Sequence, residues 1–180
     1  MKRFLLCASL LALTSTLFAQ QKPPASPAET ATATIGGHTV TISYNSPGVK
    51  GREGQIFNQG GLIQKTHKEY PVWRAGANKA TALHTDADLT IGTLDVPKGD
   101  YTLFVNIADP DNWVLIVSKK TGEWGLAYDP SEDLGKTPMT MSKPSSMVEN
   151  LKWTITGDGN KGTITLAWEN HSASVSVTAH

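Results

Sequence analysis

The side chains best able to do chemistry are concentrated between Trp73 and Asn78. This segment places an indole, the guanidinium of Arg74 and the amide of Asn78 within six residues, and Gly76 gives the backbone room to turn. Such groups can stack on a sugar ring or pair with a carboxylate or a phosphate. They can equally brace a loop, with Trp73 in the core and the polar pair bonded to backbone carbonyls, because buried polar groups need partners whether or not a ligand binds. The sequence leaves both interpretations open.

A second group of polar side chains follows at residues 84–88. In an extended strand His84, Asp86 and Asp88 would project from one face and offer nitrogen and oxygen ligands to a divalent metal ion. A polar β-turn is the simpler interpretation, because Asp favours turns and a turn would break that alignment. We therefore expect a turn here and no metal site. The candidate ligand-binding residues are Trp73, Arg74, Asn78, Thr81 and His84.

The other residue types that serve catalysis do not form a recognisable set. The remaining histidines are scattered along the chain, and no Gly-x-Ser-x-Gly motif is present. The acidic residues between Asp129 and Asp133 surround Pro130 and have the character of a solvated loop. The sequence therefore predicts no catalytic residue and no cofactor, and it leaves open whether the protein is an enzyme.

Residues 1–19 have the pattern of a secretory signal peptide. Lys2 and Arg3 precede an apolar run from Phe4 to Leu13, and Ala19 offers a small residue for cleavage. The run is too short to span a bilayer and contains Cys7, the one cysteine of the chain. The mature chain would hold no disulfide, so an ordinary hydrophobic core must stabilise it. We expect an exported protein, periplasmic or extracellular.

The charge balance argues against two classes of partner. The chain has 16 Lys and Arg residues and 16 Asp and Glu residues, and loss of the signal peptide leaves 14 against 16, a net charge of −2 with His neutral. Nucleic-acid-binding domains and polybasic membrane anchors carry a clear excess of positive charge. No later apolar run is long enough to cross a membrane. We expect neither a nucleic-acid partner nor a membrane span, and the oligomeric state stays unknown.

The hydrophobic pattern predicts a single all-β domain over residues 29–180, after an extended Pro-rich leader at 20–28. Gly36-Gly37 separates two alternating runs, Thr30–Ile35 and Val40–Tyr44, as in a β-hairpin. Trp113–Val117 is apolar on both faces, which indicates a central strand, and three one-sided strands end the chain as a meander. About ten short strands predict an antiparallel β-sandwich or a jelly-roll-like barrel.

Three segments carry weaker signals. Trp124–Tyr128 is a further strand candidate, and Thr137–Ser142 is expected at a sheet edge because Pro138 cannot donate a ladder hydrogen bond. Ser145–Asn150 has room for a single helical turn. The stretch from Asn45 to Val72 shows no clear period, and long irregular connections in compact domains are usually functional or mobile.

The five tryptophans divide into two groups. Trp113, Trp153 and Trp168 fall on the apolar faces of predicted strands, so we expect them in the core. Trp73 and Trp124 have less regular surroundings and are the candidates for a partly exposed aromatic surface.

The run Trp73-Arg74-x-Gly76-Ala77-Asn78-x-Ala80-Thr81 resembles the signature of a bacterial family known as domain of unknown function 2911. The similarity extends over nearly all of the mature chain. It includes Tyr44, Pro47, Gly51-Arg52, Ile56-Phe57, Gly99-x-Tyr101-Thr102-Leu103-Phe104, Trp113, Trp124-Gly125 and Leu166-x-Trp168-Glu169. The resemblance implies an exported, β-rich protein, and it brings no established activity with it.

Three functional hypotheses follow. The first is a non-enzymatic binding module for a small anionic or glycan-like ligand, in which the connection at 45–72 and the Trp73–Asn78 motif shape a pocket at one end of the domain. The second is a hydrolase or isomerase that uses the Trp73–Asn78 region and His84. The third is an envelope structural or protein-interaction domain that pairs through an edge such as Lys136–Ser142.

Overall fold

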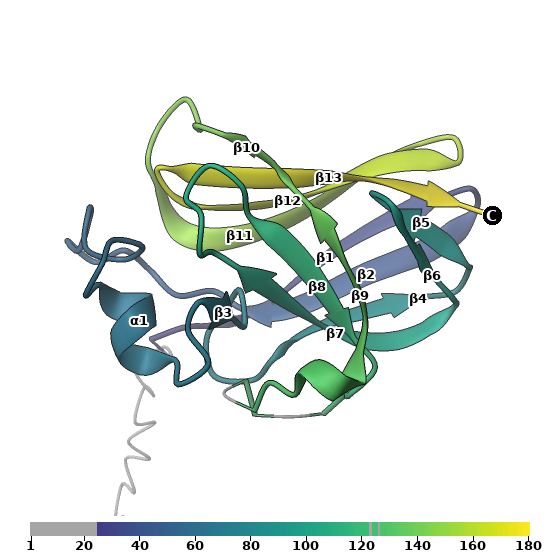
Figure 1. Ribbon diagram of the computed structural model, residues 1–180. Helices are drawn as coiled ribbons and strands as arrows, with labels where there is room; N and C mark the ends of the chain where they lie inside the picture. Colours follow the sequence, from purple (N-terminus) through teal and green to yellow (C-terminus); the bar gives the residue numbers. More distant parts are fainter. Residues whose placement is uncertain (1–24, 123, 126) are drawn as a thin grey trace, which may run out of the picture.

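The computed structural model describes residues 25–122, 124–125 and 127–180, and Figure 1 shows the chain as a ribbon. The predicted signal peptide and the first five residues of the predicted leader lie outside this part. The described residues form thirteen strands: β1 (Ala28–Ile35), β2 (His38–Asn45), β3 (Val72–Trp73), β4 (Thr81–Thr85), β5 (Leu89–Ile91), β6 (Leu94–Val96), β7 (Gly99–Asn106), β8 (Val114–Ser118), β9 (Asp133–Pro138), β10 (Thr140–Ser142), β11 (Val148–Asp158), β12 (Lys161–Glu169) and β13 (His171–Ala179). One short helix, α1 (Leu62–Thr66), and a 3-10 turn at Pro130–Glu132 complete the secondary structure of the described residues.

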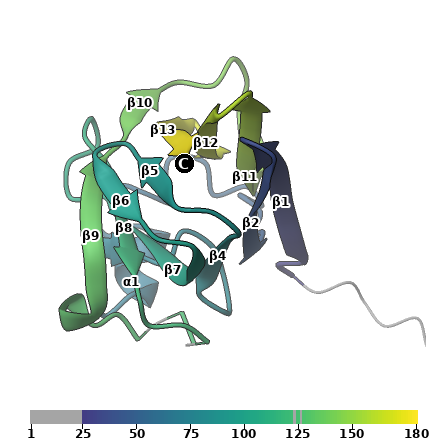
Figure 2. The ribbon, with the colours of Figure 1, turned by 90° about the vertical axis from the view of Figure 1, so that its right-hand side faces the viewer.

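The strands form two antiparallel sheets packed face to face. One sheet has the order β1-β2-β4-β7-β8-β9, with β3 paired to β7, and the other has the order β11-β12-β13-β5-β6, with β10 paired to β13. Figure 2 looks along the sandwich from the end opposite α1 and shows β1 lying beside β11 on one side. The two sheets do not join into a closed barrel, so of the two predicted architectures the β-sandwich is confirmed.

The predicted hairpin at the start of the domain is confirmed. β1 and β2 pair from Ala28 with Asn45 to Ile35 with His38, and both turn glycines have positive φ, 61° at Gly36 and 84° at Gly37. Two consecutive positive φ values suit glycine because it has no Cβ to clash with the backbone. The alternation buries Val40, Ile42 and Tyr44 between the sheets.

Strand β8 is buried on both faces, as its sequence predicts. Leu115 and Val117 face the other sheet, while Ile116 is buried on the outer side of its own sheet. Phe104 is also buried there and contacts Tyr128, whose ring centre lies 5.0 Å away. Tyr128, in the segment after β8, therefore covers this outer face. The strand predicted at Trp124–Tyr128 is wrong, because the described residues 124, 125, 127 and 128 form no strand and among them only Trp124 makes a β-bridge, to Lys79.

The C-terminal meander and the burial of three tryptophans also match the prediction. β11, β12 and β13 pair in sequence, and Trp113, Trp153 and Trp168 are 1–2% exposed. The helical turn expected at Ser145–Asn150 does not form, because residues from Val148 onward already belong to β11. The Thr137–Ser142 segment divides between the two sheets: β9 ends at Pro138 and β10 begins at Thr140.

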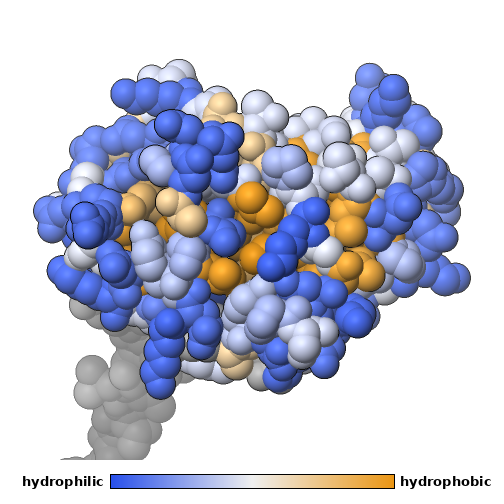
Figure 3. Space-filling view, in the orientation of Figure 1, coloured by the Kyte–Doolittle hydropathy of each residue, from blue (hydrophilic) through white to orange (hydrophobic). Residues whose placement is uncertain are grey.

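The end of the sandwich that carries α1 is built by the long irregular connection after β2 (Figure 1). Its start lies against the residues before β1: Ser46 N–H donates to Pro27 O at 2.8 Å, and Asn45 Nδ2 donates to Ser26 O at 3.2 Å. Ser26 and Pro27, which the sequence assigned to an extended leader, thus pack onto the domain. The face turned to the viewer in Figure 1 is mostly polar, with apolar residues in a band across its middle (Figure 3).

Candidate functional site

A pocket of about 510 Å³ opens at the α1 end of the sandwich. Four stretches of the chain form it: Ala25 and Ser26 before β1, the connection from Pro47 to Arg52, the α1 segment from Leu62 to His67, and the motif from Trp73 to Ala77. Trp168, near the end of β12, adds a fifth contribution. Of the residues proposed from sequence, the pocket therefore brings together Trp73 and Arg74.

The inner wall of the pocket rests on a cluster of aromatic rings. Trp73 stacks on Trp168 with ring centres 5.9 Å apart and an interplanar angle of 20°. Phe57, from the long connection, meets both indoles edge-on at 5.6 and 5.7 Å. Trp73 is only 1% exposed, so the expectation of an exposed ring at this position is wrong. A side chain enclosed this completely supports the pocket and leaves no open ring face on which a sugar could stack.

Arg74 lines the pocket with a half-buried side chain that bonds to its own loop. Its Nε donates to Gly76 O at 3.4 Å and its Nη1 donates to Asn78 O at 3.3 Å. Burial lowers the pKa of the guanidinium, which nevertheless stays charged at any physiological pH. A guanidinium has five N–H donors, and these two bonds leave three of them without a partner among the described residues. The structural and the binding interpretations of Arg74 are thus compatible.

Two further cations line the pocket from the connection after β2. Arg52 donates from Nε to Val49 O at 2.9 Å and from Nη2 to Gly48 O at 2.7 Å, so backbone carbonyls hold its guanidinium in place. Lys50 Nζ donates to Ala25 O at 2.9 Å. Within the described part of the chain none of these cations forms an ion pair, and no Asp or Glu lines the pocket. The described lining therefore carries three cations, while the Glu149 carboxylate, outside the lining, accepts from the backbone N–H of Lys50 at 2.8 Å.

Asn78 and Thr81 do not line the pocket, but they hold the loop that carries Arg74. Asn78 has a φ of 57°, a left-handed conformation that Asn tolerates better than most residues, and its backbone carbonyl accepts from Arg74. Its side chain is exposed and does not line the pocket. Thr81 is buried, and its hydroxyl donates to Ala75 O, which also accepts from Trp153 Nε1 at 2.9 Å. Both residues fix the course of the loop that carries Arg74.

His67, which sequence reasoning did not propose, follows α1 and is 8% exposed. Its Nδ1 lies 3.1 Å from Ile63 O, an acceptor, so the hydrogen-bond network places the ring proton on Nδ1. Burial, and then the nearby charge of Arg74, lower its pKa to about 4. The imidazole is therefore neutral at pH 7, and its Nε2 is a buried acceptor without a hydrogen-bond partner among the described residues.

The turn between β12 and β13 forms hydrogen bonds with the connection that carries Lys50 and Arg52. Glu169, 2% exposed, accepts from Gly54 N at 2.5 Å, and Asn170 Nδ2 donates to Glu53 Oε1 at 2.8 Å. His171 stacks on Trp113 with an interplanar angle of 9°. Burial lowers the pKa of His171, and the neighbouring Glu169 carboxylate opposes that shift. The connection that carries Lys50 and Arg52 is therefore anchored on both sides.

A family model described as "Protein of unknown function (DUF2911)" matches residues 26–177 of the chain, which includes every part of this pocket except Ala25. The chain belongs to this family. No curated protein and no solved structure is detectably similar to it. The family supplies no activity, so the function of this DUF2911 protein has to be argued from its own geometry.

His84 lies apart from the pocket of the DUF2911 domain. It is exposed on the outer face of the first sheet, where Nδ1 contacts Asp100 Oδ1 at 2.7 Å and Nε2 contacts Asp86 Oδ1 at 3.1 Å. These bonds, first the one to Asp100, raise the pKa of His84. Asp88 instead accepts from the backbone N–H of Lys98, and the chain bends at residues 86–87, which separates Asp88 from His84. The two carboxylates hold opposite ring nitrogens and do not converge on one point.

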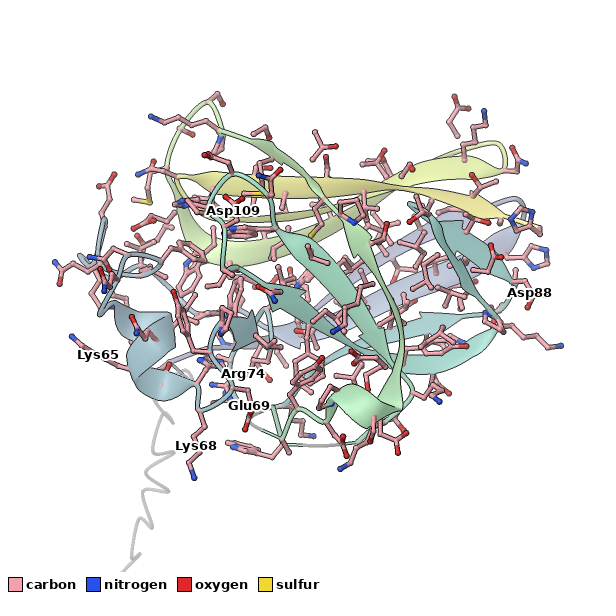
Figure 4. All side chains as sticks on the ribbon, viewed as in Figure 1. Lys65, Lys68, Glu69, Arg74, Asp88 and Asp109 are labelled. Carbon is pink, nitrogen blue, oxygen red and sulfur yellow. The ribbon has the colours of Figure 1, made fainter. Side chains whose placement is uncertain are left out.

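The described residues contain no group of three or more His, Cys, Asp or Glu side chains arranged to hold a metal ion. In the same part of the chain no helix has the length and apolar character needed to cross a membrane. Figure 4 shows the side chains of the whole domain, with Arg74 beside the α1 end and Lys65 and Lys68 extending away from it into solvent.

Proposed function

We propose that this DUF2911 protein binds a small anionic ligand in the pocket at the α1 end, without turning it over. The observation that carries the proposal is the charge of the lining: Lys50, Arg52 and Arg74 contribute three cations, and the described lining includes no Asp or Glu. The Glu149 carboxylate bonds to the backbone of Lys50, and neither guanidinium forms an ion pair within the described part of the chain. Uncompensated guanidinium groups in a partly enclosed pocket favour carboxylate and phosphate groups, which they bind through paired hydrogen bonds. A volume of about 510 Å³ suits a small molecule.

The arrangement gives less support to the hydrolase or isomerase hypothesis. That hypothesis needs His84 to act together with the Trp73–Asn78 region, but His84 lies on the outer face of the first sheet and lines a different hollow. Among the described residues that line the pocket, no Asp or Glu is present to complete an acid–base pair with His67. Ligand binding without catalysis requires no such acid–base pair.

A thermal-shift screen of carboxylates and phosphates, followed by calorimetric titration, tests the proposal. A ligand present at about 100 times its Kd stabilises the folded state by about 2.7 kcal/mol, which is readily seen in a melt. We expect Arg52→Lys and Arg74→Lys to weaken binding although charge is retained, because lysine cannot form the paired bonds of a guanidinium. Lys50→Gln should weaken binding through loss of charge.

Lys65→Gln is the matched control for Lys50→Gln. It removes one positive charge from α1 at an exposed position outside the pocket lining. We expect its affinity for the anion to equal that of the wild type. If no anion shifts the wild-type melt, or if Lys65→Gln weakens binding as much as Lys50→Gln, the pocket is not an anion site.

We also propose that the protein is exported to the periplasm or beyond. The support is the sequence of residues 1–19, with its basic start, apolar run and small residue at Ala19. Cell fractionation and N-terminal sequencing of the mature protein test this. A mature chain that begins within a few residues of Gln20 supports export, and a full-length cytoplasmic chain contradicts it.

A further inference from the structure

Three apolar side chains line the pocket together with its cations. Pro47, Leu62 and Ala77 belong to the lining and are half-buried, so part of each side chain stays accessible from the pocket. Pro47 lies in the connection that carries Arg52, Leu62 begins α1, and Ala77 lies in the motif that carries Arg74. An accessible apolar surface therefore surrounds the same space as the guanidinium groups.

Hydrogen bonds of the backbone hold these three residues in place. Pro47 O accepts from the N–H of Leu151 in β11 at 2.9 Å, and the N–H of Leu62 donates to Gln55 O at 2.9 Å. The N–H of Ala77 donates to a carbonyl at the end of β2 at 3.1 Å. Because the apolar surface is already ordered, a ligand that packs against it does not have to pay for ordering the chain.

The neutral polar side chains of the described lining offer few partners to a ligand. Thr66 donates its hydroxyl hydrogen to Leu62 O at 2.8 Å, and His67 bonds through Nδ1 to Ile63 O while its Nε2 is shielded from solvent. Ser26 is left as the neutral side chain of the described lining with a free donor. A ligand with several hydroxyl groups would lose bonds to water that these side chains cannot replace.

We infer that the preferred ligand is an anion with an apolar body, an aliphatic or aromatic carboxylate or phosphate. Its anionic group pairs with the guanidinium groups, and its body lies against Leu62, Pro47 and Ala77. The inference rests on the proposed function and names the ligand class of the same pocket. Small-molecule sites commonly combine apolar walls with a few polar groups that fix the orientation of the ligand, and this lining has both.

Calorimetric titration with matched anions tests this inference. Hexanoate is compared with gluconate, and hexyl phosphate with glucose 6-phosphate, so that each pair shares its anionic group and carbon number and differs in hydroxyl groups. Acetate, butyrate and hexanoate form a length series, and hexanol is the uncharged probe. We expect the apolar member of at least one pair to bind tighter than its hydroxylated partner. Affinity in the series should rise about 2- to 4-fold for each methylene group buried.

A variant of Leu62 assigns this gain to the α1 wall. Leu62→Asn replaces the apolar side chain by an amide of similar size. We expect it to weaken hexanoate binding about 3- to 10-fold and to change acetate binding by less than about 2-fold. Leu94→Asn is the matched control, because it makes the same substitution at a half-buried leucine in β6 that does not line the pocket. Both anions should bind to this control as they bind to the wild type.

The outcomes separate the two proposals. If the hydroxylated member of each pair binds as tightly as its apolar partner, or if affinity does not rise along the series, the apolar-body inference is wrong while the anion site stands. The inference is also wrong if Leu62→Asn keeps the full gain of hexanoate over acetate. If no anion binds, or if hexanol binds as tightly as hexanoate, the proposed anion site fails and this inference fails with it. Should Leu62→Asn not fold, the matched pairs on wild-type protein still decide the question.

Discussion

Replacement of Trp168 by alanine should destabilise the domain by about 3 kcal/mol. The side chain is 2% exposed, stacks on Trp73 and meets Phe57 edge-on. Truncation of a buried aromatic residue costs about 3–5 kcal/mol, because packing contacts are lost and a cavity remains. We expect the lower end of this range, because Nε1 has no hydrogen bond to lose and the new space opens toward the pocket.

Urea denaturation of the mature protein measures this loss. For a domain of this size, a loss of 3 kcal/mol corresponds to a fall in Tm of about 6–12 °C. Trp124→Ala makes the same substitution at a side chain that is 59% exposed, and it should change the free energy of unfolding by less than about 1 kcal/mol. Equal losses in the two variants, or a loss below about 1 kcal/mol for Trp168→Ala, would refute the packing argument.

Two further predictions concern the pocket. The pKa of His67 is about 4 in the folded protein, below its usual 6.5, so the neutral ring contributes to stability fully above pH 6.5 and this contribution is lost as the pH falls. The free energy of unfolding should fall by about 3 kcal/mol by pH 4 for this reason. A series of denaturation curves at different pH values should show a smaller loss for His67→Gln. Asn78→Ala should lower the free energy of unfolding by about 1 kcal/mol, because alanine is strained at the positive φ of this position, whereas Asn78→Gly should change it little. A larger loss for Asn78→Gly than for Asn78→Ala would show that the amide side chain itself stabilises the loop.

The fold could be predicted where one face of a strand is apolar and the other polar. The hairpin around Gly36-Gly37, the meander and the doubly buried β8 follow from period-two patterns that burial between two sheets enforces. The outer cover over Phe104 could not be predicted this way, because Tyr128 covers the sheet from backbone outside any strand, where no period-two pattern marks it. Helix α1 has five residues and buries only Ile63, so it offers no helical period to detect.

The candidate site could be predicted only in part, because most of its residues lie in a connection without a repeating pattern. Arg74 stood out because it lies in a dense run of unusual residues, and the structure places it on the pocket. Lys50, Arg52 and His67 lie in the connection without a period, and nothing local in the sequence shows that their side chains meet. The burial of Trp73 could not be predicted, because its chain neighbours show no regular alternation; its burial comes from Phe57 and Trp168, which are distant in the chain.

The bonds from Glu53 and Gly54 to the turn between β12 and β13 also determine when the pocket can be completed during synthesis. The paired residues lie 115 and 117 positions apart, so the wall with Lys50 and Arg52 has only its bonds to residues 25–27 until nearly the whole chain has left the ribosome. Contacts this far apart in sequence form late, since the loop that they close carries a large entropic cost. A chain truncated before β12 would therefore retain the β1–β2 hairpin and lack an assembled pocket, so the proposed anion binding would require completion of the polypeptide.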